Sequence, residues 1–122
     1  MTRTLDLLLL GLLLAHELDA VACREWRLLY VLRALPEDTA RTAFIALHVP
    51  LIAGLAWTAA SPVPAAHIGR LAVAAFAIVH VGLHYRLRHA PAYAFHSGLS
   101  VGLIAGAAGL GAVYLPLALN AH

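Results

Sequence analysis

Four long apolar segments make up most of this 122-residue chain, and they restrict what it can fold into. They run over residues 5–32, 39–60, 65–87 and 94–119. Each is about long enough to cross a hydrocarbon core of roughly 30 Å as a helix. Because 62% of the residues are hydrophobic and only 11% are charged, the chain lacks the polar surface that a soluble domain of this size needs. The sequence therefore predicts an all-α integral membrane protein, with residues 1–122 as a single transmembrane domain.

Short proline-containing breaks separate the four segments. They are Leu35-Pro36-Glu37-Asp38, Ser61-Pro62-Val63-Pro64 and His89-Ala90-Pro91. Connections as short as these place consecutive helices antiparallel. We therefore expect an up-down four-helix bundle.

The arginines predict how this bundle is oriented. Only Arg3 and Arg70 lie toward one end, whereas the other six flank the first and third connections: Arg24, Arg27, Arg33, Arg41, Arg86 and Arg88. Positive residues concentrate on the cytoplasmic side of a membrane protein. Both termini are therefore expected on the non-cytoplasmic side.

Histidine is the unusual residue of this composition, because the chain has eight histidines and no lysine. At about 1.5 Å per residue, we expect His16, His48 and His80 each to lie roughly 13–18 Å into the membrane from its cytoplasmic side. His84 is one turn nearer the cytoplasm than His80, and His96 lies near the start of the fourth segment. An ionisable side chain at this depth costs several kcal/mol unless it is paired, bound to a metal or in contact with water. Histidines from all four segments are therefore predicted to meet in one half of the bundle.

A metal site is the first interpretation of this cluster. His16 and Asp19 are three residues apart, and His80 and His84 are four apart, so each pair shares one helix face. Imidazole and carboxylate ligands without thiolates suit iron or zinc, with one or two ions. We predict the ligands His16, Asp19, His48, His80, His84 and His96, with Glu17 as a further ligand or as a catalytic base.

Two other interpretations remain open at this point. Two histidines on opposed helices, such as His48 and His80, could ligate haem b in an electron-transfer subunit. Alternatively, histidines, Glu17 and Asp19 could form a buried proton relay or structural network in a non-catalytic subunit. If the protein is an enzyme, its site within the bilayer favours a lipophilic substrate. Iron would then oxidise a lipid or quinone-like molecule, whereas zinc would activate water for hydrolysis with Glu17 as base.

Composition and spacing also bear on partners. The arginines occur singly or in pairs at the ends of apolar runs, so no nucleic-acid partner is expected. Gly98, Gly102 and Gly106 recur every four residues, a spacing that lets another helix approach closely. This row predicts either packing within the bundle or a homodimer interface. The single cysteine, Cys23, excludes a disulfide framework.

Four short stretches resemble small bacterial four-helix membrane proteins of uncharacterised function. They are His16-Glu17-Leu18-Asp19-Ala20, Glu25-Trp26-Arg27, Leu47-His48-Val49-Pro50 and His80-Val81-Gly82-Leu83-His84-Tyr85. The first stretch also resembles the HXXEE-domain family, although this chain has Asp19-Ala20 where that family has two glutamates. The resemblance implies a His/carboxylate site of unassigned activity in the cytoplasmic (inner) membrane of a bacterium.

Overall fold

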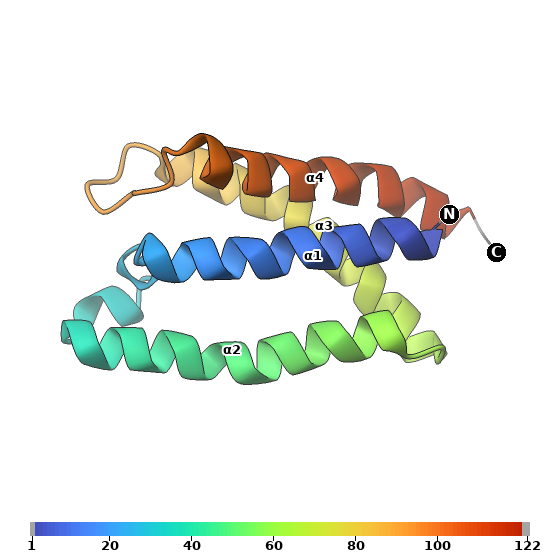
Figure 1. Cartoon of the computed structure of the whole chain (residues 1–122), viewed down its shortest axis with the longest axis horizontal. Coiled ribbons are helices and arrows are strands. Elements are labelled where there is room, and N and C mark those ends of the chain that lie inside the picture. The colour runs from blue at the N-terminus through green and yellow to red at the C-terminus, as the bar shows by residue number, and fades with distance from the viewer. Residues whose placement is uncertain (1, 121–122) are drawn as a thin grey trace.

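The computed structural model describes residues 2–120, and all regular structure within them is helical (Figure 1). The four long helices are α1 (Thr2–Ala22), α2 (Glu37–Ala60), α3 (Pro64–Leu87) and α4 (Gly98–Leu119). Successive helices run in opposite directions, so α1 begins and α4 ends at the same end of the molecule (Figure 1). The opposite end holds the connections 23–36 and 88–97 and is called the loop end below. The predicted all-α fold with four helices is confirmed.

The first helix is shorter than predicted. A helix over residues 5–32 would be about 42 Å long, well beyond the hydrocarbon thickness. Instead, α1 ends at Ala22, and Arg24 adopts a left-handed conformation with φ of 54° that a continuing helix does not allow. Two short 3-10 turns follow, η1 (Glu25–Arg27) and η2 (Leu32–Ala34).

The fourth helix begins four residues later than predicted. The Ser97 hydroxyl accepts a hydrogen bond from the backbone N–H of Ser100 at 2.9 Å, so Ser97 is the N-cap and Gly98 the first helical residue. A helix starting at residue 94 would include His96. In the structure His96 lies in the connection before α4. The middle helices differ from their predicted starts by only one or two residues.

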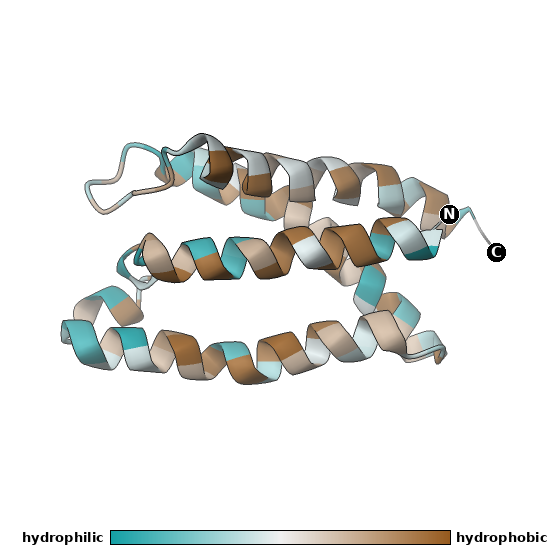
Figure 2. Ribbon diagram, in the orientation of Figure 1, coloured by the Kyte–Doolittle hydropathy of each residue, from teal (hydrophilic) through white to brown (hydrophobic). Residues whose placement is uncertain are grey.

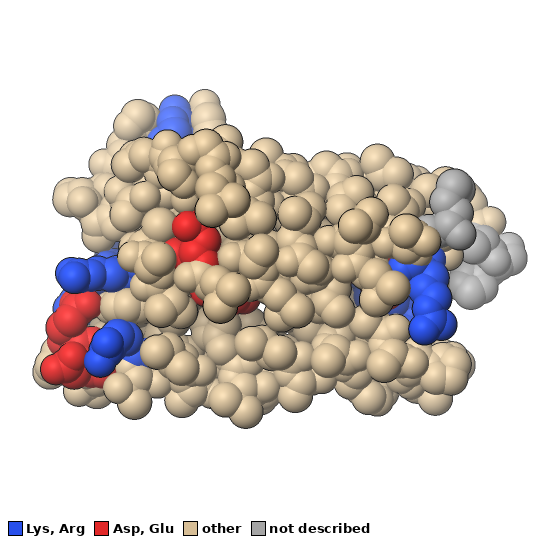
Figure 3. Space-filling model, viewed as in Figure 1, with Lys and Arg blue, Asp and Glu red and all other residues tan. Residues whose placement is uncertain are grey.

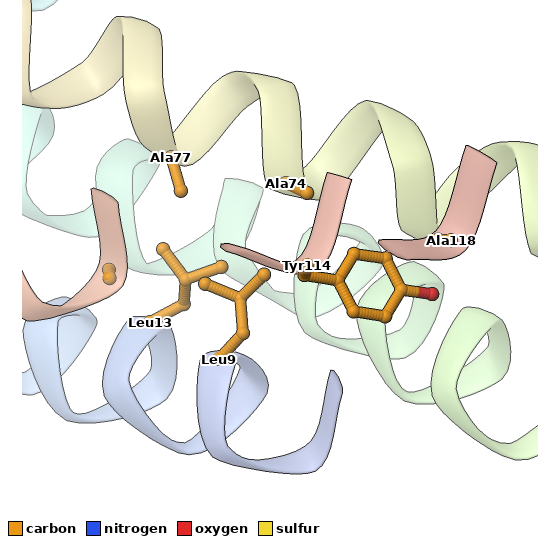
Figure 4. Close-up of a cluster of buried hydrophobic side chains, with 7 residues drawn as sticks. Leu9, Leu13, Ala74, Ala77, Tyr114 and Ala118 are labelled. Carbon is orange, nitrogen blue, oxygen red and sulfur yellow. The ribbon is translucent and has the colours of Figure 1, made fainter. Parts of the chain in front are cut away.

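The best-packed part of the bundle joins α1, α3 and α4. Leu9 and Leu13 of α1 lie against Ala74 and Ala77 of α3, and the Tyr114 ring of α4 lies beside them (Figure 4). All five are almost fully buried. Small residues at these contacts bring the helices close together.

One glycine of α4 marks the closest approach to α3. A Cβ atom added at Gly111 would lie 2.6 Å from the carbonyl oxygen of Ala74, so no side chain fits there. In the predicted glycine row, Gly106 lies next to Leu12 of α1, whereas Gly98 and Gly102 are exposed with open space around them. The homodimer interface stays a prediction.

Helix α2 packs much less tightly than the others. Only Ala40 and Phe44 are buried along its 24 residues. The larger apolar side chains beyond them are exposed: Ile45, Leu47, Val49, Leu51, Ile52 and Trp57. Exposed apolar residues of this number would be unfavourable in water.

Three helices, α2, α3 and α4, are long and apolar enough to cross a membrane. Helix α1 was predicted as a fourth span but is not among them, since it carries Asp6, Glu17 and Asp19. Hydrophobic residues predominate along the middle of the helices, and hydrophilic ones lie mainly near their ends and on the connections (Figure 2). Arginines lie at both ends of the molecule, with a largely uncharged band between them (Figure 3).

Candidate metal centre

Three imidazole rings from two helices meet at the loop end of the bundle. His80 and His84 are one turn apart on α3 and share a face, and His16 faces them from α1. The Nε2 atom of His80 lies 2.9 Å from Nε2 of His16 and 3.1 Å from Nε2 of His84. A neutral imidazole carries a single N–H, so a ring protonated on Nδ1 has an Nε2 lone pair available to bind a cation. A cation would satisfy all three nitrogens.

Glu25 of η1 adds a carboxylate to the three imidazoles. Its Oε2 lies 3.8 Å from Nε2 of His16, and its Oε1 lies 3.7 Å from Nε2 of His84. Together His16, Glu25, His80 and His84 offer four ligand atoms that all lie within 4.8 Å of one another. These four residues are called the metal centre below.

Sequence reasoning missed Glu25 as a site residue. On an uninterrupted helix, nine residues at about 100° each would place it on the face opposite His16. The left-handed Arg24 ends α1 and turns the chain back, so Glu25 reaches the histidines. The excessive length of the first apolar segment was the available signal that the helix had to end before residue 32.

The connection that carries Glu25 is held by Glu37 at the start of α2. The indole N–H of Trp26 donates to Glu37 Oε1 at 3.2 Å, and Arg27 forms an ion pair with the same carboxylate. Trp26 is 2% exposed, and its ring packs on Phe44 with centroids 5.6 Å apart. These contacts fix η1 against α2 and thereby position Glu25.

Two of the three imidazole rings of the metal centre are almost fully buried. His16 and His84 are 2% and 4% exposed, and Phe95 packs against both rings from the connection before α4. Nδ1 of His84 lies 3.3 Å from the Tyr93 hydroxyl. A proton on this Nδ1, donated to Tyr93, leaves the lone pair of Nε2 directed at the centre.

The electrostatics of Glu25 follow from its burial. Burial raises the pKa of Glu25 to about 7, and the neighbouring Glu17 carboxylate contributes to the rise. A buried carboxyl with a raised pKa gains most from a bound cation, which favours its charged form.

His48, a predicted ligand, lies beside the metal centre in a separate pair with Glu17. Its Nε2 is 2.6 Å from Glu17 Oε2, and its Nδ1 is 2.6 Å from the carbonyl oxygen of Phe44. A carbonyl only accepts hydrogen bonds, so Nδ1 carries a proton. The contact with Glu17 therefore holds one further proton, on either Nε2 or Oε2.

The other predicted ligands also lie outside the metal centre. Asp19 accepts a hydrogen bond from the Cys23 thiol at 3.8 Å, and its Oδ2 is buried without a hydrogen-bond partner among the described residues. His96 is exposed, with Nε2 3.1 Å from the carbonyl oxygen of Tyr93. Of the six predicted ligands, the structure thus brings together His16, His80 and His84, and the metal-binding roles of all six stay predictions.

Of the remaining histidines, His67 lies in the first turn of α3, at the end opposite the metal centre. His89 lies in the exposed part of the connection before α4. His122 falls outside the described residues.

A cavity of about 270 Å³ adjoins the metal centre between α1, α2 and α3. Phe44 of α2 and Phe76 of α3 contribute aromatic walls. The polar side chains of the lining come from both the metal centre and the neighbouring pair: Glu17, Glu25, His48, His80 and His84. A molecule in this cavity would thus be next to three of the four residues of the metal centre, Glu25, His80 and His84.

A family model described as a family of unknown function, DUF6713, matches residues 2–121 of the chain. The match covers nearly the whole sequence, and no link to the HXXEE-domain family accompanies it. No curated protein and no solved structure matches the chain.

Proposed function

The chain belongs to DUF6713, a family of unknown function, and we propose that it is an integral membrane protein that binds a transition-metal ion with His16, Glu25, His80 and His84. The observation that carries this proposal is the approach of three Nε2 atoms and one carboxylate to within 4.8 Å of one another. Nitrogen and oxygen ligands without thiolates suit iron or zinc. Metal bonds of about 2.0–2.2 Å are compatible with the nitrogen separations of 2.9 and 3.1 Å.

We also propose that all four helices insert into the membrane. The exposed apolar residues of α2, α3 and α4 support it, and so does the concentration of arginine at the two ends of the molecule. Helix α1 lies alongside α4 and would cross as well, because its carboxylates are turned toward protein groups. Asp6 is 7% exposed, Glu17 pairs with His48, and Asp19 accepts from Cys23. The loop end, which holds most arginines, would face the cytoplasm of a bacterium.

The geometry favours a non-haem ion over haem b. The axial ligands of a haem lie on opposite faces of the macrocycle, whereas the His16 and His80 nitrogens are only 2.9 Å apart. His48, the other candidate axial ligand, already pairs with Glu17. The relation to HXXEE-domain proteins stays part of the proposal, and it implies the same kind of His/carboxylate site.

We propose that this centre is the active site of an enzyme. Its substrate would be a lipophilic molecule bound in the adjoining cavity. A redox-active iron ion would accept electrons from the substrate and pass them to an external electron acceptor such as dioxygen, whereas a zinc ion would supply water activation. The oxidative role is the version we propose. The chain itself shields the reacting position with Phe95 and keeps Glu17 and His48 next to the cavity.

A buried network without metal is the second candidate function, and the Glu17–His48 hydrogen bond favours it. One experiment separates the two. The protein is purified in detergent, its metals are measured by elemental analysis, and its visible spectrum is recorded. We expect about one iron per chain without a Soret band. A haem spectrum, or protein without bound metal after incubation with iron or zinc, would overturn the proposal, and zinc alone would exclude its oxidative form.

A further inference from the structure

Glu17 offers the cavity a carboxyl oxygen that is free to accept a hydrogen bond. Among the described residues, no hydrogen bond uses Oε1 of this carboxyl group, whereas Oε2 contacts Nε2 of His48. The Glu17 side chain is 17% exposed and lines the cavity. This oxygen is an accessible acceptor, so a bound molecule that donates a hydrogen bond to it would be stabilised here.

Oε1 of Glu17 accepts a hydrogen bond whether the proton shared with His48 is on Glu17 Oε2 or on His48 Nε2. With the proton on His48, Glu17 is a carboxylate and both its oxygens accept. With the proton on Oε2, Oε1 is the carbonyl oxygen of the acid and still accepts. Near it, His48 Nδ1 already contacts Phe44, and Glu25, His80 and His84 belong to the metal centre. The complementary group on a ligand is therefore a hydrogen-bond donor such as a hydroxyl.

The size and walls of the cavity indicate what carries this hydroxyl. Pockets for drug-sized ligands have volumes of roughly 300–1,000 Å³, so about 270 Å³ suits a single ring better than a whole lipid. Phe44 and Phe76 approach from two different helices and can contact the faces or edges of an aromatic ring.

The cavity is open on one side. Phe76, Leu83 and Leu29 line it and are 50%, 47% and 41% exposed. Helix α3 diverges from α2 toward the loop end, where these residues lie (Figure 1). At the opposite end the two helices touch, because Gly69 leaves room for Thr58. A ring held in the cavity could thus extend an alkyl tail outward between α2 and α3.

We propose that this cavity binds the ring of a lipid-soluble phenol or hydroquinone, with Glu17 Oε1 accepting its hydroxyl hydrogen bond and its tail leaving between α2 and α3. The inference rests on the proposed function, because this ligand would be the molecule on which the metal centre acts. It assigns Glu17 to ligand binding and not to metal coordination.

The first test compares two probes on the wild-type protein. Metal-loaded protein in detergent is titrated with 4-hexylphenol and with 4-hexylanisole by calorimetry, with empty micelles as the blank. The two molecules share ring and tail, but the ether has no hydroxyl hydrogen. We expect one phenol to bind per chain. The ether should bind at least about tenfold more weakly, since a hydrogen bond to a charged acceptor contributes roughly 1.5–3 kcal/mol. Equal affinities, or no phenol binding, would overturn the inference.

Variants then locate the binding site. Glu17→Gln keeps an acceptor but not its charge and should lose only part of the phenol affinity, whereas Glu17→Ala should reduce it to the level of the ether. Phe76→Leu should weaken both probes by roughly 2–10-fold through loss of ring contacts. Val79→Ala is the matched control, because Val79 is an exposed residue of the same helix outside the cavity lining. Phenol binding unaffected by Phe76→Leu would argue against this cavity, even if Glu17→Ala does not fold.

Elemental analysis of the same samples keeps the two proposals apart. Protein that binds the phenol but never holds a metal would contradict the metal centre alone. Protein that holds a metal but does not distinguish phenol from ether would contradict the ligand assignment alone. Glu17→Gln should retain its metal, because Glu17 is not among the four residues of the centre.

Discussion

Glu25 shows how a single backbone conformation assembles the metal centre. Arg24 lies in the left-handed region, which costs a non-glycine residue roughly 1–2 kcal/mol. Arg24 lies two residues after the end of α1, and its conformation returns the chain toward His16. The contacts of Trp26 and Arg27 with Glu37 stabilise the turn and offset that cost.

Single substitutions should separate the metal centre from the wider ligand set predicted by sequence. His80→Ala and Glu25→Ala remove ligand atoms, so metal affinity should fall by more than the roughly 10–100-fold that loss of a supporting partner causes. His48→Ala and His96→Ala should retain the metal, because both lie outside the centre. Metal per chain after dialysis measures this, with the exposed His89→Ala as control. Equal metal loss in His48→Ala and His80→Ala would contradict the four-residue centre.

Metal binding should release a proton from Glu25 at mildly acidic pH. Because its pKa is raised to about 7, the carboxyl is mostly protonated at pH 6 and mostly ionised at pH 8.5. At saturating metal, wild-type protein should release roughly one proton more per ion than Glu25→Gln at pH 6, and about the same number at pH 8.5. Metal affinity should accordingly rise with pH through about 7 and level off above it. Proton release in weakly buffered detergent solution measures this, and no difference at pH 6 would contradict it.

At the scale of elements, the connection 23–36 supports the site from a distance. It joins α1 to α2 without a long helix, and its polar side chains converge on Glu37 in the first turn of α2. The neighbouring residue Asp38 occupies the same turn but is 93% exposed and pairs with the exposed Arg41. The two acidic residues thus experience the same helix dipole but have different contacts.

This difference allows a matched comparison. Glu37→Ala leaves the buried Trp26 indole N–H without its acceptor, which costs roughly 1–3 kcal/mol. We expect it to lower the Tm by several degrees and metal affinity by about tenfold, since η1 no longer holds Glu25 in place. Asp38→Ala should change neither appreciably, because exposed ion pairs contribute little. Thermal unfolding in detergent and metal titration test both variants, and identical behaviour would argue against a positioning role for Glu37.

At the scale of the whole molecule, the weak packing of α2 and the charges at the two ends are both expected of a protein in a bilayer. Two buried residues in a 24-residue helix would not hold it against the bundle in water. A bilayer removes this difficulty, because lipid covers the exposed apolar residues of α2. The six arginines at the loop end then predict which end faces the cytoplasm.

Reporter fusions test this orientation. Alkaline phosphatase fused after residue 120 should be active, because this reporter functions outside the cytoplasm, whereas green fluorescent protein at the same position should stay dark. Fusions after His89, within the connection before α4, should give the reverse pattern. The opposite result at both positions would contradict the orientation predicted from the arginines.

The helical fold and part of the site were predictable because both depend on local periodicity. Apolar runs separated by proline predicted four helices, and the spacing of His80 and His84 placed both on one face of α3. His16 was predicted to lie level with His80 because helical rise converts sequence position into depth. Local propensities did not predict where α1 ends, since the left-handed Arg24 depends on contacts made by Glu37 farther along the chain.

By itself, the sequence of this protein determined its helices, their order and the histidines available in one half of the bundle, because these follow from hydropathy and residue spacing. Only the tertiary structure decided which of them meet. It placed Glu25 with His16, His80 and His84, and it directed His48 to Glu17. The physical reason is that ligand geometry depends on helix rotation and on the path of a connection, and side-chain packing between distant segments sets both.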